Sequence, residues 1–323
     1  MHTGAQSAER AITLWLPNEI LTQVIQNAPK CDQATLCRVS RLFYGLALPS
    51  LNRTVTLCTV GFNVEVLEAF SSALIQNPER ADSVRSLTFI NGCSSTVPTE
   101  DILIQSLTLM RRLEHLSIDD SQAHMYAWEL NIEQFLSRHP TITHLRLGSE
   151  IGQNVDSADL MEGTLLPKLQ YYHGMLRLLG AFSTHSLLAL RTSWTLQNRD
   201  LVQNLVAQTN PNLSLCIECL FEHQLSDILI QLPARMPQLK KLKLLGWDRM
   251  VMSAMSVPDT VDQITAYLTR FECLTYLALN HVFDQGSSAV DNRKALQVWA
   301  NACPTLRGGG IGEMAGRKVG EQW

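Results

Sequence analysis

The sequence predicts an α/β chain in which a short module of three helices precedes an irregular solenoid of parallel strands and helices. Three observations lead to this prediction: apolar stripes separated by prolines near the N-terminus, an apolar pattern that recurs along the remaining chain, and polar residues that alternate with that pattern. The 323 residues are 46% hydrophobic and 17% charged, which is typical of a folded chain with an extensive core. We expect a disordered segment over 1–13, the helical module over 14–57, the solenoid over 58–307 and a glycine-rich tail over 308–323.

The helical module is predicted from its prolines and its capping residues. Pro17 suits the first turn of a helix, where its missing N–H costs nothing, and Pro29 ends that helix. Asp32 is expected to cap a second helix, and Ser40 a third that ends at Pro49. The first helix carries one apolar stripe, formed by Ile20, Leu21, Val24, Ile25 and Ala28. Three short helices bury too little apolar surface to be stable alone, so the module is expected to pack against another domain or a partner.

Three short motifs follow one another in this module: Leu16-Pro17-x-Glu19-Ile20-Leu21, Val39-Ser40-Arg41-x-Phe43 and Leu46-Ala47-x-Pro49-x-Leu51. Together they resemble an F-box of the kind common in fungi, with Phe43 where many F-boxes have tryptophan. The resemblance implies that the module docks onto the Skp adaptor, which joins it to a cullin scaffold. The residues that it implies for this contact are Leu16, Pro17, Ile20, Leu21, Val24, Leu36, Val39 and Phe43.

The remaining chain repeats an apolar residue, two variable residues, a leucine, one variable residue and a second apolar residue. Clear copies start at Val84, Leu113, Ile142, Leu239 and Leu274, and weaker ones at Leu169, Leu187, Leu213 and Leu306. The starts lie 18 to 35 residues apart, and most of these intervals fit one strand-plus-helix unit. Proline stands two residues before five starts, where it would mark the turn from helix to strand: Pro140, Pro167, Pro211, Pro237 and Pro304.

Helices are predicted between the strands, because several intervening segments begin with an acid and carry apolar residues at helical spacing. These segments are 101–112, 129–138, 200–208, 259–270 and 291–302. A closed barrel or a doubly wound sheet is the alternative, but strands of those folds are buried on both faces and read as continuous apolar runs. The strands here have polar alternates, so one face is predicted to meet solvent.

This pattern resembles a leucine-rich repeat, although the family's asparagine after the last strand leucine is mostly absent, so the solenoid is expected to be irregular. The strict alternation of Leu213, Leu215 and Ile217 also predicts a shifted register in that copy. Such a solenoid would bind a protein target on its concave strand face. The candidate residues are His115, His144, Arg146, Tyr171, His173, Lys241, Lys243 and Tyr276, with Trp247 just past its strand.

No motif for catalysis, a cofactor or a metal stands out, so the chain is not expected to be an enzyme. Cys216 and Cys219 with His223 lack further zinc ligands and are interpreted as ordinary thiols. His115, His144 and His173 follow one another at intervals of 29 residues and are interpreted as solvated, with a shared anion or metal as the alternative. Lysines 240, 241 and 243 are interpreted as a solvated face or a patch for an acidic partner, and the glycines from 308 to 312 as a flexible exit.

The predicted function is that of a substrate-recognition subunit of a Skp–cullin–F-box ubiquitin ligase, whose partners are the Skp adaptor, the cullin and a protein target. The net charge of −4 argues against a nucleic-acid surface, and neither a leader nor a membrane-spanning run is evident, which predicts a cytoplasmic or nuclear protein. Two alternatives stay open: a Skp-associated scaffold without ligase function, and an enzyme with an unrecognised site.

Overall fold

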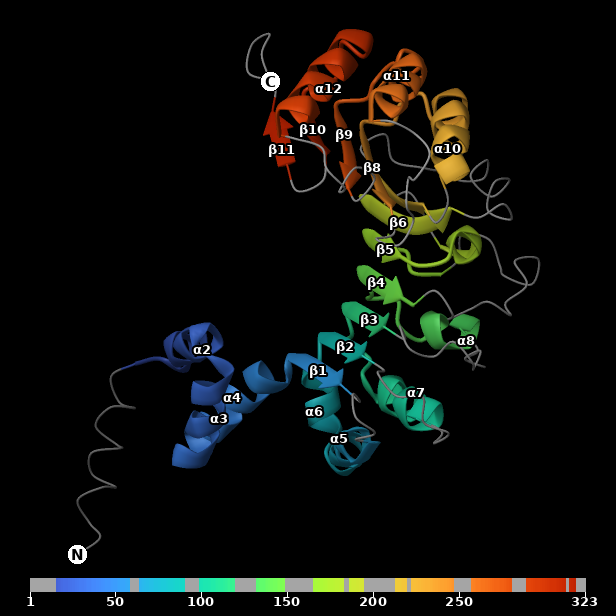
Figure 1. Ribbon diagram of the computed structural model, residues 1–323. Helices are drawn as coiled ribbons and strands as arrows, with labels where there is room; N and C mark the ends of the chain where they lie inside the picture. The colour runs from blue at the N-terminus through green and yellow to red at the C-terminus, as the bar shows by residue number, and fades with distance from the viewer. Residues whose placement is uncertain are drawn as a thin grey trace, which may run out of the picture. The chain divides into compact units, whose positions relative to one another are not determined.

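The structure, a computed structural model, divides into two compact units, residues 1–125 and 126–323. Figure 1 labels the helices and strands of the chain. The described residues are 16–58, 64–90, 99–119, 132–148, 165–182, 186–194, 213–219, 222–246, 257–280, 289–311 and 314–317. No helix in these ranges is long and apolar enough to cross a membrane.

The first unit begins with the three predicted helices, α2 (Asn18–Asn27), α3 (Lys30–Val39) and α4 (Arg41–Asn52). Ser40 caps α4 as expected, since its hydroxyl accepts a hydrogen bond of 3.3 Å from the amide of Phe43. Two predicted boundaries are wrong. Helix α3 starts before Asp32 and has no side-chain cap, and α4 continues through Pro49 to Asn52.

The ends of α2 and α4 are held by side chains of α3. The Lys30 ammonium donates to the carbonyls of Ser50 and Leu51 at 2.7 and 2.8 Å, and so binds backbone acceptors at the C-terminus of α4. The buried amide of Gln33 donates to the carbonyls of Ile25 and Ala28 at 3.0 and 2.9 Å, at the C-terminus of α2. These bonds join the three helices into one module.

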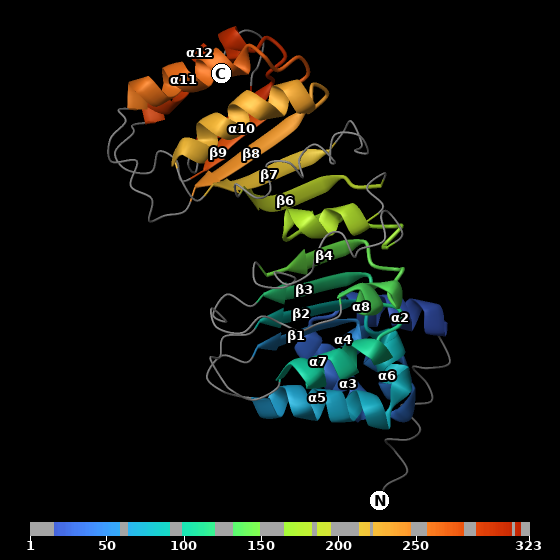
Figure 2. The same ribbon diagram turned by 90° about the vertical axis from the view of Figure 1, so that its right-hand side faces the viewer.

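The rest of the first unit has three parallel strands in chain order, with helices between them (Figure 2). Its elements are β1 (Thr54–Cys58), α5 (Val64–Gln76), α6 (Pro78–Ser83), β2 (Ser86–Ile90), α7 (Thr99–Leu109) and β3 (His115–Asp119). In β2 and β3 every second side chain is buried. The alternation that the sequence predicted is therefore present.

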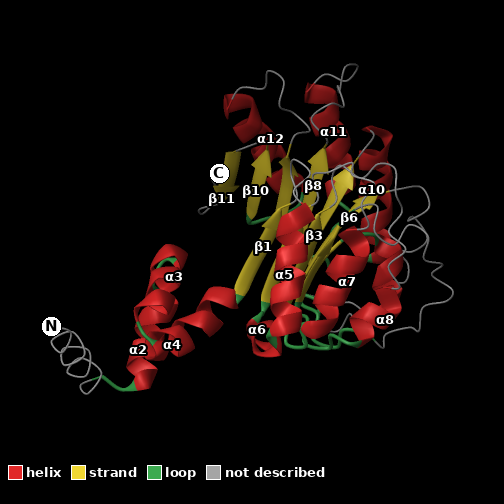
Figure 3. Ribbon diagram, turned by 90° about the horizontal axis from the view of Figure 1, so that it is seen from below, coloured by secondary structure: helices red, strands yellow, loops and turns green. Residues whose placement is uncertain are grey.

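The second unit has seven parallel strands in chain order and a final antiparallel strand. Its strands are β4 (His144–Leu147), β5 (Tyr171–His173), β6 (Ala189–Trp194), β7 (Ser214–Cys219), β8 (Lys241–Gly246), β9 (Tyr276–Asn280), β10 (Gly308–Ile311) and β11 (Met314–Arg317). Its helices are α8 (Ile132–Ser137), the 3₁₀ helix η2 (Leu176–Ala181), α10 (Glu222–Arg235), α11 (Val257–Leu268) and α12 (Ala289–Ala302). Figure 3 shows α10, α11 and α12 beside one face of the strands.

This open sheet with strands in chain order is an α/β fold consistent with the predicted solenoid. It differs from both alternatives, because a doubly wound sheet reverses its strand order and a barrel closes on itself. The core of the second unit lies on the helix-covered face, where leucines from strands β4, β6, β7, β8 and β9 occupy the same level. These aligned and buried leucines are Leu145, Leu190, Leu215, Leu242 and Leu277.

A recurrent turn leads into the strands, and this explains the position of the prolines. The amide of the repeat's first residue donates to the carbonyl three residues before it, as from Ile142 to His139 and from Leu306 to Cys303, at 3.1 and 2.9 Å. Four of the five predicted turn prolines occupy this turn, and Pro211 lies outside the described residues. The shortest repeat, from Leu169 to Leu187, has η2 in place of an α-helix.

The shifted register predicted for the copy at Leu213 is confirmed: Leu215 and Ile217, two and four residues after its start, are buried and align with Leu242 and Leu244 of β8, which lie three and five residues after theirs. One further expectation is wrong. Glycines 308–310 are not a flexible exit, since they form the buried strand β10, paired with β9 on one side and β11 on the other. Glycine has no side chain to restrict it, but two neighbouring strands supply the hydrogen bonds that fix it here.

Candidate interaction surfaces

The three-helix module exposes large apolar side chains that its own core does not use. Ile20 and Val24 lie one turn apart on α2, and Val24 is 61% exposed. Leu16 and Val39 are also exposed. We call these four residues the apolar helix surface. Aliphatic side chains left exposed on a module this small are candidates for contact with another protein.

The other residues predicted for the adaptor contact differ in accessibility. Pro17 is exposed, and Leu36 and Phe43 are half-buried. Leu21 is only 7% exposed and belongs to the core of the module. The apolar stripe predicted for α2 includes both exposed and buried side chains. Helical spacing alone does not show which edge of such a stripe faces the neighbouring helices.

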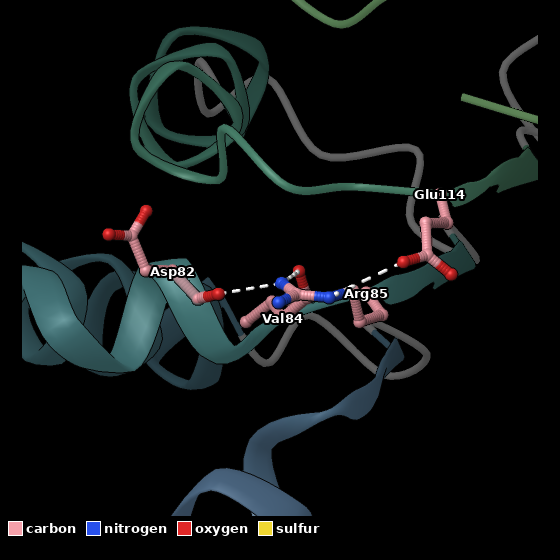
Figure 4. Close-up of polar contacts among 4 residues, drawn as sticks. All are labelled: Asp82, Val84, Arg85 and Glu114. Atoms are coloured by element: carbon pink, nitrogen blue, oxygen red, sulfur yellow. Dashed lines mark hydrogen bonds and ion pairs between the residues drawn. The ribbon is translucent and has the colours of Figure 1, made fainter. Parts of the chain in front are cut away.

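In the first unit, Arg85 joins the last turn of α6 to the segment that precedes β3 (Figure 4). Its Nη1 donates to the carbonyls of Asp82 and Val84 at 2.6 and 3.3 Å, and its Nε lies 3.4 Å from Oε1 of Glu114. The Arg85 carbonyl also accepts bonds from the amides of Glu114 and His115. This arrangement fixes adjacent repeats to each other and is structural.

The second unit presents a solvent-facing side of strands β4 to β9, which we call the outward strand face. Strand pairing places its side chains in rows across the sheet. One row runs through His144, Tyr171, Ala189, Ser214, Lys241 and Tyr276. The next runs through Arg146, His173, Arg191, Cys216, Lys243 and Ala278.

The predicted strand residues of the second unit therefore lie on one face. Arg146, Tyr171, Lys241 and Lys243 are exposed, while His144, His173 and Tyr276 are half-buried. His115 takes the equivalent position in the first unit, paired with Ser86. Trp247 lies outside the described residues.

Aromatic contacts order part of this face. The rings of His144 and Tyr171 stack with centroids 4.1 Å apart, and the ammonium of Lys243 lies 5.9 Å from the centre of the Tyr276 ring. His144 and His173 belong to different rows, so the 29-residue interval does not align them. In the part of the chain that the structure describes, no three metal-ligating side chains gather into a site.

An ion-pair cluster at the centre of the face was missed by sequence reasoning. Nε and Nη2 of Arg191 approach Oε1 of Glu218 at 2.7 and 2.6 Å, and Nε2 of His173 lies 3.6 Å from the same oxygen. The interaction with His173, together with the charge and hydrogen bonds of Arg191, lowers the pKa of Glu218 to about 2, although burial acts in the opposite direction. The carboxylate is therefore ionised at neutral pH.

Cys216 lies between Arg191 and Lys243 in the second row. Burial raises the pKa of its thiol, and the two neighbouring cations only partly oppose this effect. The side chain is therefore a neutral thiol at neutral pH. Cys216 contributes a small, uncharged position between two cations.

Comparison with known proteins adds no relative to this description: neither a family model nor a curated protein matches the sequence.

Proposed function

We propose that this chain is the substrate-recognition subunit of a Skp–cullin–F-box ubiquitin ligase. The three-helix module would bind the Skp adaptor, and the outward strand face would hold the target. The observation that carries the proposal is the apolar helix surface, which lies on a module whose motifs resemble an F-box.

The physical support comes from the balance of buried and exposed apolar side chains. Leu21, Ile25 and Ala47 are buried in the module, whereas Leu16, Ile20, Val24 and Val39 remain in contact with water. Burying an aliphatic side chain of this size contributes about 1.5–3 kcal/mol. A partner that covers these four residues would gain a substantial part of its binding free energy from them, which is what an adaptor contact requires.

The mechanism that follows is proximity. A receptor that holds its target beside a separate conjugating enzyme raises the effective concentration of the target's lysines around the reactive thioester. No residue of this chain would form or break a covalent bond in that scheme. The receptor's own task is to bind the adaptor and the target at once.

The test compares charge insertion on and off the apolar helix surface. Ile20→Asp and Val24→Asp should each weaken capture of co-expressed Skp adaptor at least about tenfold, because a carboxylate cannot be buried there without a partner. Gln26→Asp is the matched control, since it adds the same charge at an exposed position of the same helix. Circular dichroism should show unchanged helix content in all three variants.

Leu21→Asp has a different expected result. It inserts a charge into the core of the module, so it should unfold the helices and lose the adaptor indirectly. Undiminished adaptor capture by Ile20→Asp and Val24→Asp would refute the proposed F-box contact. Capture of the adaptor without a cullin would support a Skp-associated scaffold in place of a ligase subunit.

A further inference from the structure

We propose that the outward strand face of the second unit binds an acidic polypeptide segment through Lys241 and Lys243, and that Glu218 acts as an internal competitor by occupying Arg191. The inference names the chemical class of the target and rests on the proposed function for the role of this binding. The charges and the strand register of the face support the binding itself.

Charge is segregated onto this face. The whole chain carries a net charge of −4, yet the described outward positions of β4 to β9 hold four cations and one carboxylate. The cations are Arg146, Arg191, Lys241 and Lys243, and the carboxylate is Glu218. A local field opposite in sign to the net charge selects negatively charged partners and steers their approach.

The two lysines of β8, Lys241 and Lys243, are the cations available to a ligand, because no described carboxylate neutralises them. Both are exposed, and no carboxylate of the described ranges forms an ion pair with either. They are two residues apart on one strand, so their side chains leave the same side about 7 Å apart. An extended peptide repeats its own side chains at the same interval, so a Glu-x-Glu segment aligned with β8 places one carboxylate at each lysine.

The neighbours of these lysines suit a peptide. Tyr276 lies beside Lys241 in the first row and beneath the ammonium of Lys243, where it offers a half-buried ring for apolar contact. Ser214 and Cys216 on β7 are small and uncharged, so they leave room for a chain. A nucleic acid instead needs a longer row of cations to follow its phosphates, and the net charge of −4 does not favour its approach.

The carboxylate of Glu218 already forms with Arg191 the ion pair that a carboxylate of the proposed ligand would form. Arg191 shares a row with Lys243, with one strand between them, which places their backbones about 10 Å apart. Its guanidinium is held by Glu218 at 2.6 and 2.7 Å. Removing the charge of Glu218 would release Arg191 toward a ligand carboxylate, and it would also remove the carboxylate that, among the described outward positions, repels that ligand.

The experiment measures fluorescence anisotropy of two labelled peptides with the full chain, co-expressed with its adaptor where that raises the yield. One peptide alternates glutamate with glycine, and the other has glutamine in place of glutamate. The glutamate peptide should bind and the glutamine peptide should not. Lys241→Ala with Lys243→Ala should weaken binding about tenfold, and Glu218→Gln should strengthen it about threefold or more.

The control is Lys168→Ala with Lys294→Ala, which removes the same charge from exposed lysines away from this face and should change binding less than about twofold. Equal damage by the control pair, equal binding of both peptides or no binding of either would overturn the proposed site. Tighter binding of a single-stranded oligonucleotide would replace the peptide with nucleic acid, and an unchanged affinity in Glu218→Gln would overturn the internal competitor. Adaptor capture is read separately, so loss of peptide binding with adaptor capture intact leaves the proposed F-box function standing.

Discussion

The Arg191 guanidinium and the His173 ring both approach the single carboxylate of Glu218, and this contact stabilises the fold as well as shaping the outward strand face. Its pKa of about 2 lies below the ordinary value of 4.5, so folding favours the ionised form. A group of this kind contributes stability above its unfolded pKa, and that contribution is lost as the pH falls from 4.5 toward 2.

Glu218→Gln should therefore lower the free energy of unfolding at neutral pH by about 1–3 kcal/mol, because Arg191 loses its partner. The difference between the two proteins should shrink as the pH falls below 4.5, where the native carboxylate is progressively protonated. Urea unfolding of both proteins across this range measures it. A difference that stays constant with pH would show that shape, and not charge, explains the loss.

At the residue scale, sequence reasoning placed Lys241, Lys243 and Tyr276 on the solvent-facing side, where the structure has them. It missed Arg191 and Glu218, because they lie in the two weak copies of the repeat and 27 residues apart. Only the register of β6 against β7 brings them together. Two opposite charges at outward positions of successive copies are the signal that could have found them.

At the element scale, all nine predicted repeat starts precede a strand, because leucine packing against the helices imposes a strong local pattern. Helices were less predictable. Helices α7, α8, α11 and α12 overlap predicted segments, the segment 200–208 lies outside the described residues, and α5 and α10 were not predicted. Pro233 lies inside α10, as Pro49 lies inside α4, so the usual sign of a helix end is overridden there by packing against neighbouring elements.

Strand β5 has a tyrosine at the level where its neighbours have leucine, and a glycine makes room for it. Tyr172 is buried, donates a hydrogen bond of 2.8 Å to the carbonyl of Met175 and packs edge-on against Phe182. A Cβ added to Gly174 would lie 2.7 Å from the Tyr172 hydroxyl. The larger core residue is thus compatible with the sheet only because Gly174 follows it.

We expect Gly174→Ala to lower the free energy of unfolding by about 1–3 kcal/mol, since the Tyr172 ring must shift within a packed core. Gly180→Ala is the matched control, because a Cβ there meets nothing within 4 Å. Thermal unfolding followed by circular dichroism compares the two. Equal stability of both variants would indicate that Tyr172 has an alternative position at little cost.

At the scale of the whole molecule, each unit is a row of strands in which every repeat is stabilised chiefly by its neighbours. The last strand of such a row needs a partner for the backbone N–H and C=O groups at its open edge. In the second unit, β11 turns back antiparallel against β10 and provides it. This terminal strand pair was not predicted from the sequence, because three consecutive glycines are more often part of a flexible segment than of a buried strand.

A chain that ends at Arg307 should therefore be less stable than the full chain by several kcal/mol, on the order of 3. It loses the ladders that join β9, β10 and β11, and it loses Ile311, which is 1% exposed. Strand β9 becomes an unpaired edge, so the shortened chain should also associate in solution. A chain that ends at Arg317 keeps both strands and is the control. Urea unfolding and light scattering of the two chains decide the matter, because a true flexible tail could be removed at either point with the same result, whereas a terminal strand pair makes only the shorter chain unstable and prone to associate.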